Sequence, residues 1–168
     1  ALLRASLVDS DNTAHFVLLR NLDPTEIEDI YTHLGFDDVI DALKSSPNDQ
    51  GLDNRITAKR YTIFFRSLYN ATFLSPDSAQ KFLTILKDAP QEYAAVGIEN
   101  GTPYIHKTGI RVDDLVWADS GIVYLPGRPY LLTIMIQKKD GIMPKDGEVE
   151  RIFEAISREI YQYVREVR

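Results

Sequence analysis

The hydrophobic positions of this chain follow two different periods. In residues 1–98 apolar side chains recur mainly every three or four positions, as on an α-helix with one buried face. After Pro103 the period becomes that of β-strands, and residues 148–165 return to the helical period. The order predicts an α+β fold, with a mostly helical part over residues 1–98 and strands plus a closing helix over residues 99–168.

Capping residues and apolar faces predict the helices. Asp23 precedes Pro24 and predicts a helix that ends at Gly35. Thr57 and Ser75 are the expected N-caps of two further helices. The closing helix is expected to bury a face made of Val149, Ile152, Phe153, Ile156, Ile160 and Val164.

Three segments are typical of β-strands, over residues 104–108, 117–124 and 130–137. Pro126 and Gly127 suit a type II turn between the last two, which predicts an antiparallel pair. The third segment is apolar on both faces, as in a central strand with a neighbour on each side. Only one neighbour is evident, so we expect a strand to be missing or to come from another polypeptide.

Composition excludes several classes of protein. The 168 residues are 44% hydrophobic, which predicts a packed core, and contain no cysteine, which excludes disulfides, thiol nucleophiles and zinc ribbons. The formal charge of -6 argues against a nucleic-acid partner. His15, His33 and His106 are not spaced as metal ligands, and no apolar run is long enough to span a bilayer. We expect neither a metal nor a cofactor.

Three segments resemble signature regions of one family. Ser10-Asp11-Asn12 precedes a helical segment, Lys107-Thr108-Gly109 ends the first strand, and residues 118–127 read Ala-Asp-Ser-Gly-Ile-Val-Tyr-Leu-Pro-Gly. In this order they resemble the class A members of the serine β-lactamase and penicillin-binding protein superfamily. The resemblance implies a helical subdomain and an antiparallel sheet with a C-terminal helix. By this resemblance we expect three strands here, and two N-terminal strands of the family to be missing.

The resemblance also implies chemical roles for two of these segments, the Ser10 box (Ser10-Asp11-Asn12) and the Lys107 box (Lys107-Thr108-Gly109). The family attacks a β-lactam or a D-alanyl-D-alanine peptide with a serine and forms an acyl-enzyme. Ser10 is then expected to pass a proton toward the leaving nitrogen, and Lys107 to hold the Ser10 hydroxyl and supply positive potential. Asp11 is expected to brace its loop.

Four further residues are expected to bind substrate by the same resemblance. The Asn12 amide would orient it, and the Thr108 hydroxyl would bind its carboxylate. Gly109 would leave room for it along the strand edge, and the backbone N–H of Ile110 would donate to the oxyanion.

The nucleophile box of the family, Ser-x-x-Lys, should precede Ser10, yet it occurs once, at Ser78 to Lys81. We interpret that copy as a polar helix start. The acylating serine is therefore expected to lie in a segment before Ala1, and the chain alone to be inactive. Alternatively, the chain is an assembly module whose sheet a partner chain completes.

The family's loop glutamate, which activates the deacylating water, is absent from residues 45–54. Asp49 and Asp53 are the acids there. Slow deacylation would favour a penicillin-binding or D,D-peptidase-like activity over an efficient β-lactamase, and a non-catalytic member that binds cell-wall peptides is a third alternative. From the family alone we expect an extracytoplasmic protein.

Overall fold

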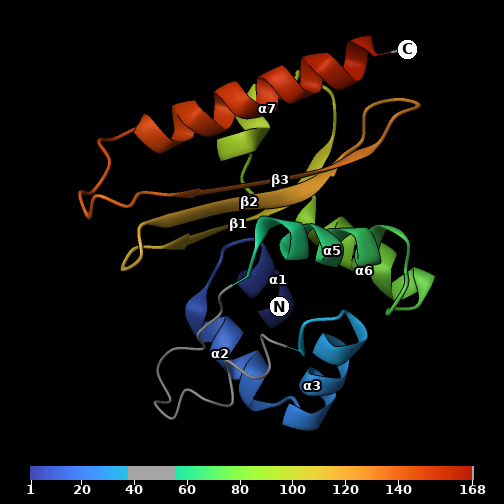
Figure 1. The fold of residues 1–168 in the computed structure, drawn as a ribbon. Helices are drawn as coiled ribbons and strands as arrows, with labels where there is room; N and C mark the ends of the chain where they lie inside the picture. Colours follow the sequence, from blue (N-terminus) through green and yellow to red (C-terminus); the bar gives the residue numbers. More distant parts are fainter. Residues whose placement is uncertain (38–55, 168) are drawn as a thin grey trace.

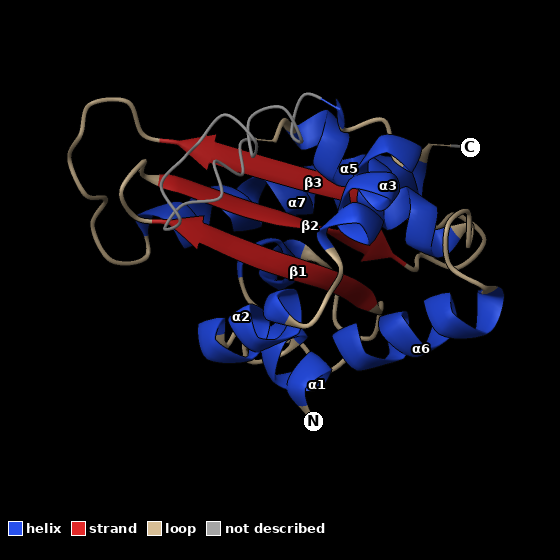
Figure 2. Ribbon diagram, turned by 90° about the horizontal axis from the view of Figure 1, so that it is seen from below, coloured by secondary structure: helices blue, strands red, loops and turns tan. Residues whose placement is uncertain are grey.

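The computed structural model describes residues 1–37 and 56–167. A three-stranded antiparallel sheet lies between the long helix α7 on one face and shorter helices on the other (Figures 1 and 2). The helices are α1 Leu2–Leu7, α2 Asn12–Arg20, α3 Pro24–His33, α5 Ala58–Tyr69, α6 Pro76–Leu86, the 3-10 helix η1 Tyr93–Gly97, and α7 Glu148–Glu166. The strands are β1 Tyr104–Arg111, β2 Val116–Val123 and β3 Tyr130–Gln137.

Local signals explain most helix starts. Thr57 caps α5 by accepting from the backbone N–H of Arg60, and Ser75 caps α6 in the same way. Asp23 accepts from the N–H of Thr25 at the start of α3, where Pro24 occupies the first turn. The predicted caps at Asp23, Thr57 and Ser75 are therefore confirmed.

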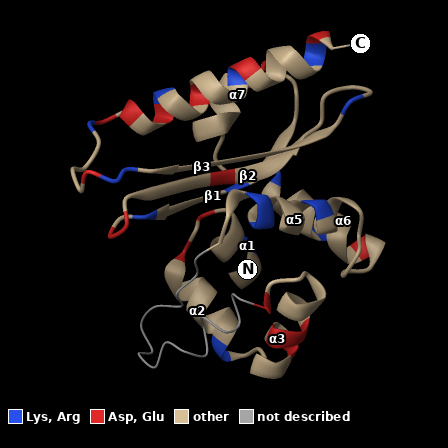
Figure 3. Cartoon of the chain, viewed as in Figure 1, with Lys and Arg blue, Asp and Glu red and all other residues tan. Residues whose placement is uncertain are grey.

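The sheet separates two apolar cores. Trp117, Val123 and Leu132 face α7 and η1, whereas Ile105 and Ile122 face α5 and α6. Charged residues occur all along α7, while the strands are largely free of them (Figure 3). Lys107 on β1 and Asp119 on β2 are therefore charged residues within a largely apolar sheet.

The strand order is β1-β2-β3, so the described part of the sheet gives β3 a single neighbour. The α5 helix packs on one face of β3 and α7 on the other, as the apolar sequence of residues 130–137 predicts. The N–H of Tyr124 donates to the Pro103 carbonyl. Together with the strand register, this bond shows which residues direct their backbone N–H and C=O groups toward the neighbouring strand and which direct them away from it. Ile110 then directs its N–H toward the free edge of β1, and Thr133 directs its own away from β2.

The buried face of α7 differs from the predicted one. Val149, Phe153, Ser157 and Tyr161 are buried, whereas Ile152 and Ile156 are 41% and 38% exposed. The helices η1 and α7 approach so closely that a Cβ on Gly97 would lie 2.0 Å from Ser157 Oγ. The residue of α7 that faces Gly97 must therefore be small. That close packing turns the helix so that the row containing Ser157 faces inward. The prediction for Ile152 and Ile156 was wrong.

Strand bounds also shifted slightly. The first strand runs three residues beyond the predicted end, to Arg111, and the second begins and ends one residue earlier than predicted. Gly127 has φ 72°, and the N–H of Arg128 donates to the Leu125 carbonyl, as the predicted turn requires. Over residues 1–37 and 56–167, every helix is too short or too polar to cross a membrane.

Candidate functional site

A pocket of about 200 Å³ lies where the N-terminal helices meet β1. Ser10, Lys107 and Thr108, three of the predicted site residues, contribute to its wall. The other lining residues are Leu7, Val8, Asp9, Ala89, Pro90, Glu92 and His106. Two segments far apart in the sequence thus form one concave surface.

Ser10 connects α1 to α2 in a left-handed backbone conformation, with φ 53°. Such a conformation costs a non-glycine residue on the order of 1–3 kcal/mol, so the surrounding structure must hold it. The next residue, Asp11, caps α2 by accepting from the Ala14 N–H at 2.6 Å. This matches the bracing role expected of Asp11, and it fixes the direction in which the chain leaves Ser10.

Lys107 Nζ donates a hydrogen bond to Ser10 Oγ across the pocket. Lys107 is half-buried, and its own backbone carbonyl accepts from the Tyr61 hydroxyl of α5 at 3.2 Å. Burial lowers the pKa of the Lys107 ammonium, while the charges of Glu92 and Asp119 oppose that shift. The structure thus joins the two residues expected to handle protons.

The side chain of Thr108 projects from the face of β1 opposite to that of Lys107, as strand alternation requires. Its hydroxyl donates to Glu92 Oε1 at 3.4 Å. Sequence reasoning missed Glu92, because it precedes η1 in a segment that looks like a simple turn. The pocket wall therefore carries an acid beside the two hydroxyls and the ammonium.

Gly109 and Ile110 continue β1 beyond the pocket lining. A Cβ on Gly109 would meet nothing within 4 Å, so the face of the strand is open at this position. The Ile110 side chain is 54% exposed, and its N–H points to the free edge of β1. An acceptor lying along β1 could reach that N–H without displacing β2.

The remaining candidates lie apart from the pocket lining. Asn12 is exposed in the first turn of α2. Ser78 is exposed in the first turn of α6, where its hydroxyl bonds Ser75 Oγ at 2.9 Å, as expected for a polar helix start. Asp49 and Asp53 lie outside the described residues.

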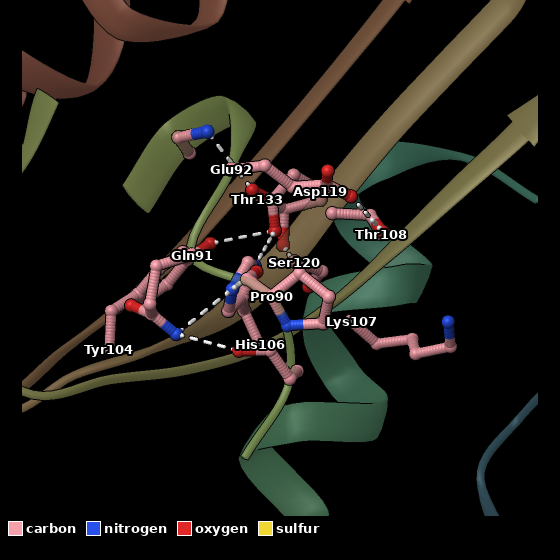
Figure 4. A network of polar contacts seen from close by, with 12 residues as sticks. Pro90, Gln91, Glu92, Tyr104, His106, Lys107, Thr108, Asp119, Ser120 and Thr133 are labelled. Atoms are coloured by element: carbon pink, nitrogen blue, oxygen red, sulfur yellow. Dashed lines mark hydrogen bonds and ion pairs between the residues drawn. The ribbon is translucent and has the colours of Figure 1, made fainter. Parts of the chain in front are cut away.

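His106, one of the lining residues, belongs to a buried polar cluster (Figure 4). His106 and Asp119 are both fully buried and are joined at 2.9 Å. The Tyr104 hydroxyl donates to the same carboxylate at 3.0 Å. His106 faces away from the Lys107 side chain, as the alternation of neighbouring side chains along a strand requires. An aspartate in the middle of an apolar strand was a signal that could have suggested a buried partner.

One known family matches almost the whole sequence. The sequence profile described as the beta-lactamase enzyme family matches residues 1–164. The chain belongs to the beta-lactamase enzyme family. The resemblance noted from the Ser10 and Lys107 boxes is thereby confirmed at the level of the family. A comparison with curated protein sequences gave no match.

Solved structures of this family share the fold. The chain is 20% identical to PBP-A, with a TM-score of 0.76, and the match covers 99% of this chain and 61% of that one. A beta-lactamase from Sphaerobacter thermophilus is 19% identical (TM-score 0.75, 99% and 62% covered), and one from Xanthomonas campestris pv. campestris is 20% identical (TM-score 0.79, 97% and 63% covered). The chain thus spans about three fifths of the length of these structures.

Proposed function

We propose that these residues form part of a serine hydrolase that acts on β-lactams or D-alanyl-D-alanine peptides through an acyl-enzyme. The observation that carries the proposal is the hydrogen bond from Lys107 Nζ to Ser10 Oγ inside the pocket. Family membership supports the reaction class. A PBP-A variant solved as an acyl-enzyme complex with penicillin G, 21% identical to this chain, has the same fold.

In this proposal Ser10 and Lys107 deliver the proton that the leaving nitrogen needs. Because the lysine donates to Ser10 Oγ, the hydroxyl hydrogen of Ser10 is free to point into the pocket. As the C–N bond of the substrate breaks, that hydrogen passes to nitrogen and Lys107 returns a proton to Oγ. The lowered pKa of Lys107 makes its ammonium a better acid for the step.

The free edge of β1 is the proposed place for the substrate. The Ile110 N–H is available there as one oxyanion donor, and such a donor typically stabilises a transition state by about 3 kcal/mol. Gly109 leaves space for the substrate to approach the strand. Thr108 would bind the substrate carboxylate once its hydroxyl turns from Glu92, and Asn12 would orient the substrate from α2.

The acylating serine is proposed to lie outside these 168 residues. The one Ser-x-x-Lys of the chain begins at Ser78, which is hydrogen-bonded to Ser75 and does not line the pocket. An added segment could also complete the sheet, because Leu131, Thr133 and Met135 direct their backbone groups away from β2. Ile152 and Ile156 leave apolar surface exposed on α7. A second chain could supply such a segment instead.

The reaction is proposed to end in slow deacylation, because the sequence of residues 45–54 contains no glutamate. This favours a penicillin-binding or D,D-peptidase-like activity. A member that binds cell-wall peptides without cleaving them would share the pocket but would form no acyl-enzyme. The proposed location is outside the cytoplasm, where peptidoglycan and β-lactams are met.

Labelling with a fluorescent penicillin tests the proposal. The product of the gene that encodes these residues should become covalently labelled, and Lys107→Met should slow labelling about 100-fold or more. Lys87→Met is the matched control, because Lys87 is exposed after α6 and does not line the pocket. Absence of labelling in the unmodified protein, or equal rates for the two variants, would overturn the proposal.

A further inference from the structure

The His106 ring is fully buried, and each of its nitrogens faces an oxygen acceptor. Nδ1 lies 2.9 Å from Asp119 Oδ1, and Nε2 lies 3.1 Å from the Pro90 carbonyl oxygen. Figure 4 shows His106 with these two partners. Neither oxygen can donate a hydrogen as a carboxylate or a carbonyl.

This arrangement decides between the protonation states of the ring. A neutral imidazole carries one N–H, so one nitrogen lone pair would face an oxygen lone pair in a buried site. An imidazolium donates to both oxygens. Asp119 is the matching anion, since its carboxylate also accepts from the Tyr104 hydroxyl at 3.0 Å and from the Ala94 N–H at 3.1 Å. A buried ion pair with its remaining positions satisfied in this way is tolerated in a protein interior.

One alternative involves Gln91. Its Nε2 lies 3.5 Å from His106 Nε2 and could donate to a neutral ring. However, that contact lies at the limit of hydrogen-bond distance, and the Pro90 oxygen is closer to the ring, at 3.1 Å. The shorter contact favours a hydrogen on Nε2, which donates to the Pro90 oxygen.

We propose that His106 is a buried imidazolium which, with Asp119, fastens residues 90–94 to β1 and thereby positions the pocket wall opposite Ser10. His106 is thus a positioning residue. Its importance for substrate binding rests on the proposed function, whereas its charge and its anchoring role do not.

The anchoring follows from where the two bonds attach. His106 holds Pro90 and Asp119 holds Ala94, so one ion pair fixes the chain on both sides of Glu92. Between them Tyr93 adopts a left-handed conformation, with φ 51°. The bonds of His106 to Pro90 and of Asp119 to Ala94 therefore determine where Glu92 contacts the Thr108 hydroxyl.

Titratable groups from neighbouring elements lie near the His106 ring. The Asp119 carboxylate on β2 contacts the His106 ring. Tyr104 on β1 stacks on the ring and donates a hydrogen bond to that carboxylate. Glu92 lies on the wall beside it, and Lys107 follows it on β1. Burial, followed by the charges of Glu150, Glu92 and Asp119, raises the pKa of the Tyr93 hydroxyl on η1.

Nitrogen-15 NMR of the histidine rings tests the protonation state in this chain. The spectrum is recorded at pH 8, and the exposed His15 and His33 provide internal reference signals. His106 should show two protonated nitrogens with imidazolium shifts. A neutral His106 with a single protonated nitrogen would overturn the proposal, without bearing on the hydrolase activity.

Two substitutions test the anchoring. Asp119→Asn should make His106 neutral at pH 8 and shift the backbone amide resonances of Glu92 and Thr108. His33→Gln should leave both resonances unchanged, because His33 is exposed at the end of α3. If Asp119→Asn leaves the Glu92 and Thr108 resonances in place, the anchoring role is wrong. If that variant fails to fold, His106→Gln is read by the same resonances, and the ring spectrum of the unmodified chain still decides the charge.

Discussion

Lys107 on β1 donates a hydrogen bond to Ser10, although 97 residues separate the two in the chain. The bond exists because α1 and α2 pack beside the edge of the sheet, where Leu7 and Val8 help to line the pocket. A lysine that is half-buried against such a wall is less easily protonated than one on the surface. The contact thus connects the packing of the N-terminal helices to the acidity of one amine.

The lowered pKa of Lys107 predicts a pH dependence of stability. Between that pKa and the ordinary value of about 10.4, the unfolded chain binds more protons than the folded one, so this group makes the free energy of unfolding rise with pH. Lys107→Met removes the contribution. Urea unfolding between pH 7 and 10 should show the unmodified chain gaining stability relative to this variant as pH rises.

The control for this titration is Lys87→Met, at an exposed position after α6. Its stability difference from the unmodified chain should stay constant over the same pH range. Parallel curves for Lys107→Met and the unmodified chain would contradict the depressed pKa.

Two buried tyrosine hydroxyls predict opposite effects of removing an oxygen. The Tyr104 hydroxyl donates to the Asp119 carboxylate, so Tyr104→Phe should cost about 1.5–3 kcal/mol. The Tyr130 hydroxyl has no hydrogen-bond partner within the described residues, and burial raises its pKa to about 12. Tyr130→Phe should therefore be neutral or slightly stabilising. Urea unfolding compares the two, and similar losses would refute the assignment.

The contact between Gly97 and α7 predicts a large effect from a single methyl group. A Cβ at Gly97 would lie 2.0 Å from Ser157 Oγ and 2.3 Å from the Glu154 carbonyl, so Gly97→Ala should destabilise by about 1–3 kcal/mol. Adding Ser157→Gly should not restore stability, because the backbone overlap at Glu154 remains. Gly109→Ala is the control and should stay within about 0.5 kcal/mol, since its Cβ meets nothing. Thermal unfolding of the three variants would expose any failure of this ranking.

Most helices and strands could be predicted from local sequence signals. Thr57 and Ser75 cap the helices predicted for them, and β3 has the predicted bounds, because capping and alternation depend on neighbours in sequence. The orientation of α7 was not predictable in this way. It depends on the close approach of Gly97 to Ser157, two residues brought together only by tertiary packing.

The site was predictable where family motifs mark it. The Ser10 and Lys107 boxes indicated two residues that the structure brings into contact. Glu92 and the pairing of His106 with Asp119 were not foreseen. That pairing depends on strand register, and Glu92 joins the wall because the segment around it is held to the sheet.

The account predicts that the chain of 168 residues has no acylating serine of its own. Incubated alone with a chromogenic cephalosporin, it should give no turnover above the buffer rate. Hydrolysis that depends on Ser78 would show that the polar start of α6 had been misinterpreted. Hydrolysis lost on Ser10→Ala would assign the nucleophile to Ser10 instead.

Mapping the acyl group by mass spectrometry tests the central claim most directly. After exposure of the full gene product to a fluorescent penicillin, the adduct should map to the serine of a Ser-x-x-Lys sequence outside residues 1–168. The isolated chain should gain no mass under the same conditions. An adduct on Ser10, Ser78 or any other serine of this chain, or no adduct on the gene product at all, would contradict the account.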